Sequence, residues 1–242
     1  MSTALELPLI STELLREVES SALAKGLLRA NLVEAAARAA AALSRKLLEN
    51  QLENATIVAL VGTGVKAAVA LHTMRILQGF GAECTVVLTS GEKEMRPETL
   101  SAAQLIESLR LRMLQPRSPL VRNAIADADL VIDGLIGVGL EGAPREPAAT
   151  LIRTANEQRA EVLSLEVPTG LDPDSGAPSQ PTLKARATLA LGLPAQGLFG
   201  ALAWQFTGEL WLCDVGYPLS ALDEHELDGD GLFRENELVR LR

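Results

Sequence analysis

The chain has 242 residues, of which 48% are hydrophobic and 22% charged, enough for one large α/β domain with a substantial core. Its net charge of −9 and aromatic content of 3% disfavour a nucleic-acid-binding surface, because such surfaces need clustered basic residues and aromatic rings. No apolar run is long enough to span a membrane, and the stretch from Met1 to Leu9 has no basic segment typical of a signal peptide. We therefore expect a cytoplasmic protein with neither a nucleic-acid nor a membrane partner.

Helix-like and strand-like segments alternate along most of the chain. Two helices are predicted first, one running from a cap at Ser11 or Thr12 to Lys25 and one from a cap at Asn31 to Leu48. Strands are then predicted at residues 56–61, 84–88, 130–132, 162–165, 187–191 and 209–215, and further helices at 65–78, 97–110, 119–126 and 147–159. This alternation predicts an α/β fold, with a mostly parallel sheet and helices on both faces. Residues 1–218 form the predicted domain, and residues 219–242 read as an acidic, polar, peripheral tail.

Two consecutive strands end in an acidic residue followed by a glycine-rich turn. The first reads V-I-D-G-L-I-G-V-G-L-E-G-A from Val131, and the second reads V-L-S-L-E-V-P-T-G from Val162. Ligands of open α/β sheets bind outside the carboxyl ends of the strands, so Asp133 and Glu166 are expected side by side at the mouth of one crevice. The alternative is that the glycines only make turns and the acids only cap helices.

A glycine loop follows the first predicted strand. The run from Gly62 to Ala67 fits G-x-G-x-x-A, a weak form of the dinucleotide-binding fingerprint. The next strand ends without the carboxylate that would hold a ribose, which disfavours NAD-dependent dehydrogenase chemistry. Backbone N–H groups at the start of the following helix could still favour an anion. Lys66 is unexpected there because a cation is disfavoured at a helix N-terminus, unless its side chain points to water.

Three motifs give the chain a resemblance to a known family. They are D-G-L-I-G-V-G-L-E-G-A-P-R-E-P from Asp133, V-P-T-G-L-D-P-D-S-G from Val167 and C-D-V-G-Y-P from Cys213. With them the chain resembles the YjeF N-terminal domain, the family of NAD(P)H-hydrate epimerases, over roughly residues 12–218. The resemblance implies a Rossmann-like three-layer sandwich with two leading helices. It also implies a homodimer and an isomerase that interconverts the R and S forms of hydrated NADH and NADPH, NAD(P)HX, with bound potassium.

The chain departs from the family where the glycine loop enters its helix. The family carries N-N-G-G-D there, and this chain has the run Val65 to Val69 instead. By resemblance, the potassium ligands fall on Lys66, Asp133 and Thr169. A protonated lysine cannot ligate a metal. We therefore predict that the Lys66 ammonium occupies the potassium position, bonded to the Asp133 carboxylate and the Thr169 hydroxyl.

Two functions follow from this comparison. The first is a diverged family member, a pseudoenzyme that binds a small nucleotide-like ligand and has weak or no epimerase activity. The second is an active epimerase with Asp133 as acid and base. Potassium and NAD(P)HX are implied by the resemblance alone. The predicted ligand-binding residues are Gly62, Thr63, Gly64, Lys66, Gly137, Val138, Gly139, Leu140, Glu141, Gly142, Ala143 and Glu166.

Overall fold

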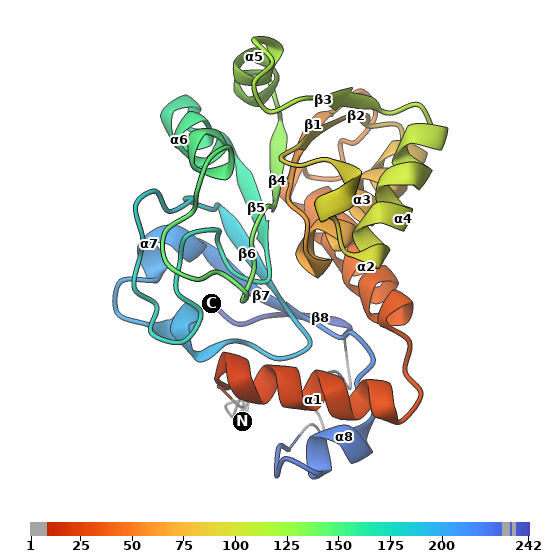
Figure 1. Ribbon diagram of the computed structural model, residues 1–242, viewed down its shortest axis with the longest axis vertical. Coiled ribbons are helices and arrows are strands. Elements are labelled where there is room, and N and C mark those ends of the chain that lie inside the picture. The colour runs from red at the N-terminus through yellow and green to blue at the C-terminus, as the bar shows by residue number, and fades with distance from the viewer. Residues whose placement is uncertain (1–8, 229–232, 234–235) are drawn as a thin grey trace.

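The computed structural model describes residues 9–228, 233 and 236–242. In that part of the chain an eight-stranded sheet has the order β3-β2-β1-β4-β5-β6-β7-β8 (Figure 1). β1 to β7 pair in parallel, and β8 is antiparallel to β7. The strands are β1 (Thr56–Val61), β2 (Glu83–Leu88), β3 (Arg112–Leu114), β4 (Leu130–Gly134), β5 (Val162–Leu165), β6 (Ala187–Leu191), β7 (Glu209–Cys213) and β8 (Leu238–Arg240).

Helices cover both faces of this sheet. They are α1 (Thr12–Ala24), α2 (Arg29–Leu47), α3 (Val65–Gly79), α4 (Pro97–Ser108), α5 (Leu120–Ala126), α6 (Ala148–Gln158), α7 (Trp204–Thr207) and α8 (Leu219–Asp223), with short 3-10 turns η1 (Glu92–Glu94) and η2 (Gln196–Phe199). α2, α3 and α4 pack in the core on one face, and α5 and α6 pack on the other. The predicted α/β sandwich with a mostly parallel sheet is confirmed.

The core explains why the strands read as continuous apolar runs. In β1, Ile57 and Ala59 face the core under α2 and α3, while Val58 and Leu60 face the core under α5 and α6. All four are fully buried. A parallel strand buried on both faces needs apolar residues at every position rather than at alternate ones.

Most predicted elements match the structure, and three differences have physical reasons. Ser11 caps α1 by accepting a hydrogen bond from Leu14 N, as predicted. The predicted cap at Asn31 is wrong, because α2 begins at Arg29 with Leu28 at its N-cap. β3 and β8 were not predicted, since three-residue strands give too short a pattern and depend on their neighbours for pairing.

Part of the predicted tail belongs to the fold. Its first residues form α8, which lies beside α1 (Figure 1), and Val239 of β8 pairs with Leu212 of β7. β8 forms because the edge of β7 offers it backbone hydrogen bonds, and the sequence of the tail alone does not indicate this pairing. Residues 1–8, 229–232 and 234–235 lie outside the described residues, so the reading of the N-terminal stretch and of the middle of the tail stays a prediction.

The strand order places a crevice at one edge of the sheet. From β1 the chain proceeds outward to β2 and β3, and then returns to β4 on the other side of β1. The order therefore reverses between β1 and β4, and ligands of open α/β sheets bind at the carboxyl ends of strands at such a point. Among the described residues, no helix is long and apolar enough to cross a membrane.

Candidate functional site

The loops after β1 and β4 come into close contact at this edge. Gly62 N donates a hydrogen bond to Gly134 O at 3.0 Å. A Cβ atom on Gly62 would lie only 1.9 Å from Leu135 O, so no larger residue fits without moving the backbone. Gly64, in contrast, has nothing within 4 Å of such an atom. The first glycine of the G-x-G-x-x-A run therefore serves the packing of two loops.

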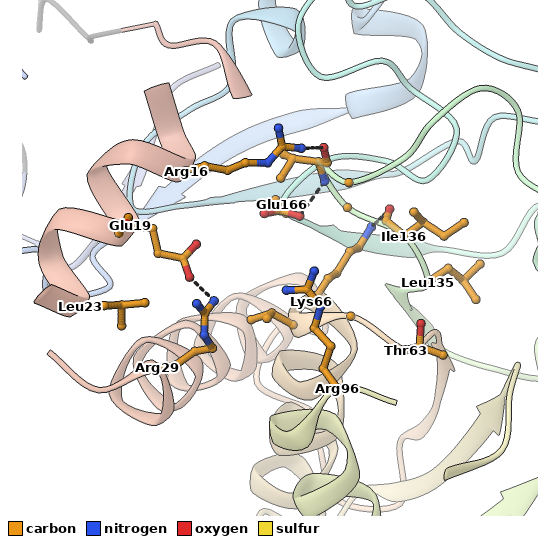
Figure 2. A pocket seen from close by; sticks show the side chains of 16 residues that line it. Arg16, Glu19, Leu23, Arg29, Thr63, Lys66, Arg96, Leu135, Ile136 and Glu166 are labelled. Carbon is orange, nitrogen blue, oxygen red and sulfur yellow. Dashed lines mark hydrogen bonds and ion pairs between the residues drawn. The ribbon is translucent and has the colours of Figure 1, made fainter. Parts of the chain in front are cut away.

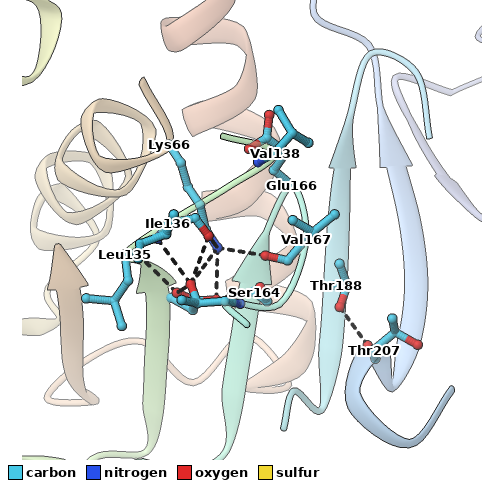
Figure 3. A network of polar contacts seen from close by, with 11 residues as sticks. Lys66, Leu135, Ile136, Val138, Ser164, Glu166, Val167, Thr188 and Thr207 are labelled. Carbon is cyan, nitrogen blue, oxygen red and sulfur yellow. Dashed lines mark hydrogen bonds and ion pairs between the residues drawn. The ribbon is translucent and has the colours of Figure 1, made fainter. Parts of the chain in front are cut away.

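Lys66 turns inward from the first turn of α3. Its Nζ atom lies 2.9 Å from Asp133 Oδ2 and 3.2 Å from Thr169 Oγ1, the two contacts predicted for it. It also donates to Val167 O at 2.7 Å and to Ile136 O at 3.2 Å (Figure 3). The side chain is only 3% exposed, so it does not point to water. We call these four oxygen atoms, from Asp133, Thr169, Val167 and Ile136, the oxygen cage.

Asp133 lies beneath the crevice rather than at its mouth. It is fully buried, and its Oδ1 accepts hydrogen bonds from Thr169 Oγ1 at 2.7 Å and Leu135 N at 3.1 Å. Its Oδ2 accepts from Lys66 Nζ, from Ser164 Oγ at 2.8 Å and from Thr169 N at 2.9 Å. The expected position at the mouth of the crevice is wrong for Asp133, because β4 continues to Gly134 and keeps Asp133 within the sheet. Both oxygens of its carboxylate therefore accept hydrogen bonds from other residues of the same chain.

Of the two acidic residues predicted at the strand ends, Glu166 is the one that lines the crevice. It has a left-handed backbone with φ of 63°, which is strained for a residue other than glycine and often marks a functional position. Its Oε2 accepts a hydrogen bond from Val138 N at 3.0 Å, and burial raises the pKa of its carboxyl group. A Cβ atom on Gly137 would lie 1.7 Å from that oxygen, so glycine at 137 makes room for the carboxylate.

Two cavities lie against these loops. The larger, of about 500 Å³, is lined by Thr63, Gly64, Lys66, Gly137, Val138, Gly139 and Glu166 among the predicted residues (Figure 2). The smaller, of about 400 Å³, is lined by Gly62, Thr63, Gly139, Leu140, Glu141 and Ala143. Gly142 lines neither of these two. Thr63 and Gly139 belong to both walls, so the cavities adjoin. The sequence motifs thus converge on one region.

Sequence reasoning missed several polar residues of this region. Arg16 and Glu19 of α1, Arg29 of α2 and Arg96 before α4 line the larger cavity. Arg96 follows β2, whose carboxyl end lies at the same sheet edge, so strand-end reasoning could have found it. The positions on α1 and α2 carry no such signal. Here "cleft" denotes the larger cavity.

Comparisons with known proteins agree with this architecture. The model of the family described as YjeF-related protein N-terminus matches residues 29–197. The chain belongs to this family. The yeast protein YNU0 (YNL200c) has a similar crystal structure, with a TM-score of 0.84 and 17% identity over 97% of this chain and 100% of that one. At that identity the likeness shows the fold alone.

Three relatives of the chain share the name NAD(P)H-hydrate epimerase. The NAD(P)H-hydrate epimerase of Dehalogenimonas lykanthroporepellens is 35% identical over 77% of this chain and 73% of the relative. That of Cenarchaeum symbiosum is 31% identical over 88% of this chain and 97% of the relative. That of Rhodopirellula baltica is 27% identical over 92% and 90%. These similarities support the family membership.

The oxygen cage does not fit a potassium ion while Lys66 is in place. Carboxylate, hydroxyl and carbonyl oxygens are the ligands that hard cations prefer. The ammonium of Lys66, however, bonds to all four of these atoms. A metal ion at their centre would displace the ammonium or lie against its charge.

Proposed function

We propose that this chain is a diverged member of its family that binds a small nucleotide-like ligand in the cleft and has weak or no NAD(P)H-hydrate epimerase activity. The observation that carries the proposal is the Lys66 ammonium within the oxygen cage, 2.9 Å from Asp133 Oδ2. Lys66 supplies from the protein itself the positive charge that the family resemblance assigns to potassium.

The environment of Asp133 supports this proposal. A group that transfers protons to a ligand must lie within hydrogen-bond reach of it, directly or through one water. Asp133 is fully buried and accepts five hydrogen bonds from Lys66, Leu135, Ser164 and Thr169. This arrangement favours a carboxylate that holds the two strand ends together over one that exchanges protons with a ligand.

The residues after Lys66 support the proposal as well. Ala67, Ala68 and Val69 stand where the family resemblance leads one to expect glycines and aspartate. All three are buried in the core on the α2 side of the sheet. They stabilise packing and offer a ligand no side-chain hydrogen bond, and each hydrogen bond to a charged ligand group is worth about 1.5–3 kcal/mol.

The alternative is an active epimerase, which the names of the relatives favour. Incubating the purified protein with R-NADHX and following formation of the S form separates the two. The relative from D. lykanthroporepellens is the positive control, and the reaction without added protein is the negative control. We expect turnover far below that of the positive control. Turnover comparable to it overturns the proposal.

A further inference from the structure

Three arginines from separate segments line the open side of the cleft. Arg16 comes from α1, Arg29 from the first turn of α2, and Arg96 from the residue before α4. Figure 2 shows Arg16 above Glu166 in this view, and Arg29 and Arg96 reaching up from below it, with the guanidinium of Arg29 turned to Glu19. In a chain with a net charge of −9, three guanidinium groups around one cavity form a local positive field.

Arg96 is held in place by its backbone while its guanidinium is left unpaired. Its N–H donates to Thr63 O at 3.0 Å. Thr99 Oγ1 donates to Gly64 O at 2.8 Å, so two hydrogen bonds join the start of α4 to the glycine loop. Among the described residues, no carboxylate pairs with the Arg96 side chain. The charge of Arg96 is therefore available to a ligand.

Arg29 already has acidic partners that an anion could replace. It forms an ion pair with Glu19, and its Nε lies 3.3 Å from Glu98 Oε1. Arg16 donates to Val138 O at 3.3 Å, a neutral and long contact. The side chains of the two Arg29 ion pairs are about 30% exposed, and ion pairs at such exposure are weak and exchange readily. Glu19 thus competes with a ligand for Arg29.

The arrangement selects a class of ligand. Guanidinium groups bind phosphate oxygens through pairs of parallel hydrogen bonds. A cavity lined by carboxylates would instead repel a phosphate. Gly64 and Val65, at the start of α3, lie in the same wall and add the positive end of the helix. Glu19 and Glu166 are the acidic residues of the lining, and Glu19 is already paired with Arg29.

We propose that Arg16, Arg29 and Arg96 form a clamp for a phosphoryl group of the ligand, with Arg96 as its principal contact and Glu19 as an internal competitor. This inference rests on the proposed function, because it names the chemistry that the ligand-binding cleft recognises. The clamp residues come from the two leading helices and from the residue before α4.

Calorimetric titration at low ionic strength tests the clamp with three probes, namely inorganic diphosphate, ADP and adenosine. We expect ADP and diphosphate to bind and adenosine to bind much more weakly. Arg96→Ala should weaken ADP binding about 10-fold or more, since it removes hydrogen bonds to a charged group. Glu19→Gln should strengthen it by removing one of the two acidic partners of Arg29. Arg122→Ala changes the net charge equally, at a residue paired with Glu157 and outside both cavities, and should have no effect.

Each other outcome counts against the clamp. Equal losses in Arg96→Ala and Arg122→Ala would indicate a general charge effect. Adenosine binding as tightly as ADP, or no binding of any probe at millimolar concentration, would also overturn it. An unchanged melting temperature of Arg96→Ala shows that the variant is folded. The R-NADHX assay fails or succeeds independently of these titrations, so the clamp and the proposed function can be refuted separately.

Discussion

Lys66 Nζ and Asp133 Oδ2 lie 2.9 Å apart in an ion pair that is almost completely shielded from water, with side chains 3% and 0% exposed. The pair joins the first turn of α3 to the end of β4. The carbonyls of Ile136 and Val167, in the loops after β4 and β5, also accept hydrogen bonds from the ammonium. A cation at the start of a helix is unfavourable by itself. Here the side chain of Lys66 points away from the helix, and its ammonium bonds to the four atoms of the oxygen cage. The carboxyl ends of β4 and β5 thus converge on one ammonium.

Removing the ammonium should destabilise the fold strongly. Lys66→Ala leaves Asp133 buried without its cation, and breaking a buried pair by removing one partner costs about 3–5 kcal/mol. Denaturant unfolding followed by circular dichroism measures the loss. The double variant Lys66→Ala with Asp133→Asn should lose less than the sum of the two single variants, because the uncompensated charge is gone. Strict additivity would show that the pair contributes no coupling.

The protein should not respond to potassium in particular. If Lys66 supplies the cage with its positive charge, the melting temperature should be the same in equal concentrations of potassium and sodium chloride. Lys66→Asn removes the ammonium, and asparagine is the residue that the family resemblance places there. This variant should gain stability in potassium relative to sodium. A rise in the melting temperature of the wild type that is specific to potassium would contradict the view that Lys66 supplies the charge of the cage.

Sequence reasoning found the parts of this site that side-chain chemistry specifies. The boundaries of β1 and β5 follow from mainly apolar runs, and the contacts of Lys66 with Asp133 and Thr169 were predicted from the family motif. The carbonyls of Ile136 and Val167 could not be predicted, because any residue type can present a carbonyl. The direction of a loop backbone depends on tertiary packing.

The arginines of the cleft show a second limit. Arg16 and Arg29 lie on helices that precede the sheet, and their approach to the cleft depends on how α1 and α2 pack across it. An exposed arginine on an amphipathic helix carries no sequence signal for that packing. The same limit applies to β8, whose strand conformation depends on the edge of β7.

Gly62 and Gly64 should respond differently to the same substitution. Gly62→Ala places a methyl group 1.9 Å from Leu135 O, which must move the backbone of one loop, and overpacking of this kind costs about 1–3 kcal/mol. Gly64→Ala meets open space and changes only the N-cap of α3, at a cost below about 1 kcal/mol. Thermal unfolding of the two variants makes the comparison. Equal effects would show that the loops after β1 and β4 are not packed as tightly as described.

Glu166 should reduce stability at neutral pH and cease to do so in acid. Burial raises the pKa of its carboxyl group above the ordinary value of 4.5, so the folded state binds this proton more tightly than the unfolded state does. Between the unfolded and the folded pKa the free energy of unfolding falls as the pH rises. Above the folded pKa the full cost of the buried charge is present.

Glu166→Gln removes that titration and keeps an oxygen that can accept the hydrogen bond from Val138 N. The variant should therefore be more stable than the wild type at about pH 8, and the difference should vanish at about pH 4. Glu146→Gln is the control of opposite sign. Hydrogen bonding from Thr150 lowers the pKa of Glu146, so this substitution should remove a stabilising effect at neutral pH that is lost in acid. Denaturant unfolding curves over this pH range measure both differences. A Glu166→Gln variant less stable than the wild type at about pH 8 would show that the protein stabilises this carboxylate as an anion, and would contradict the raised pKa.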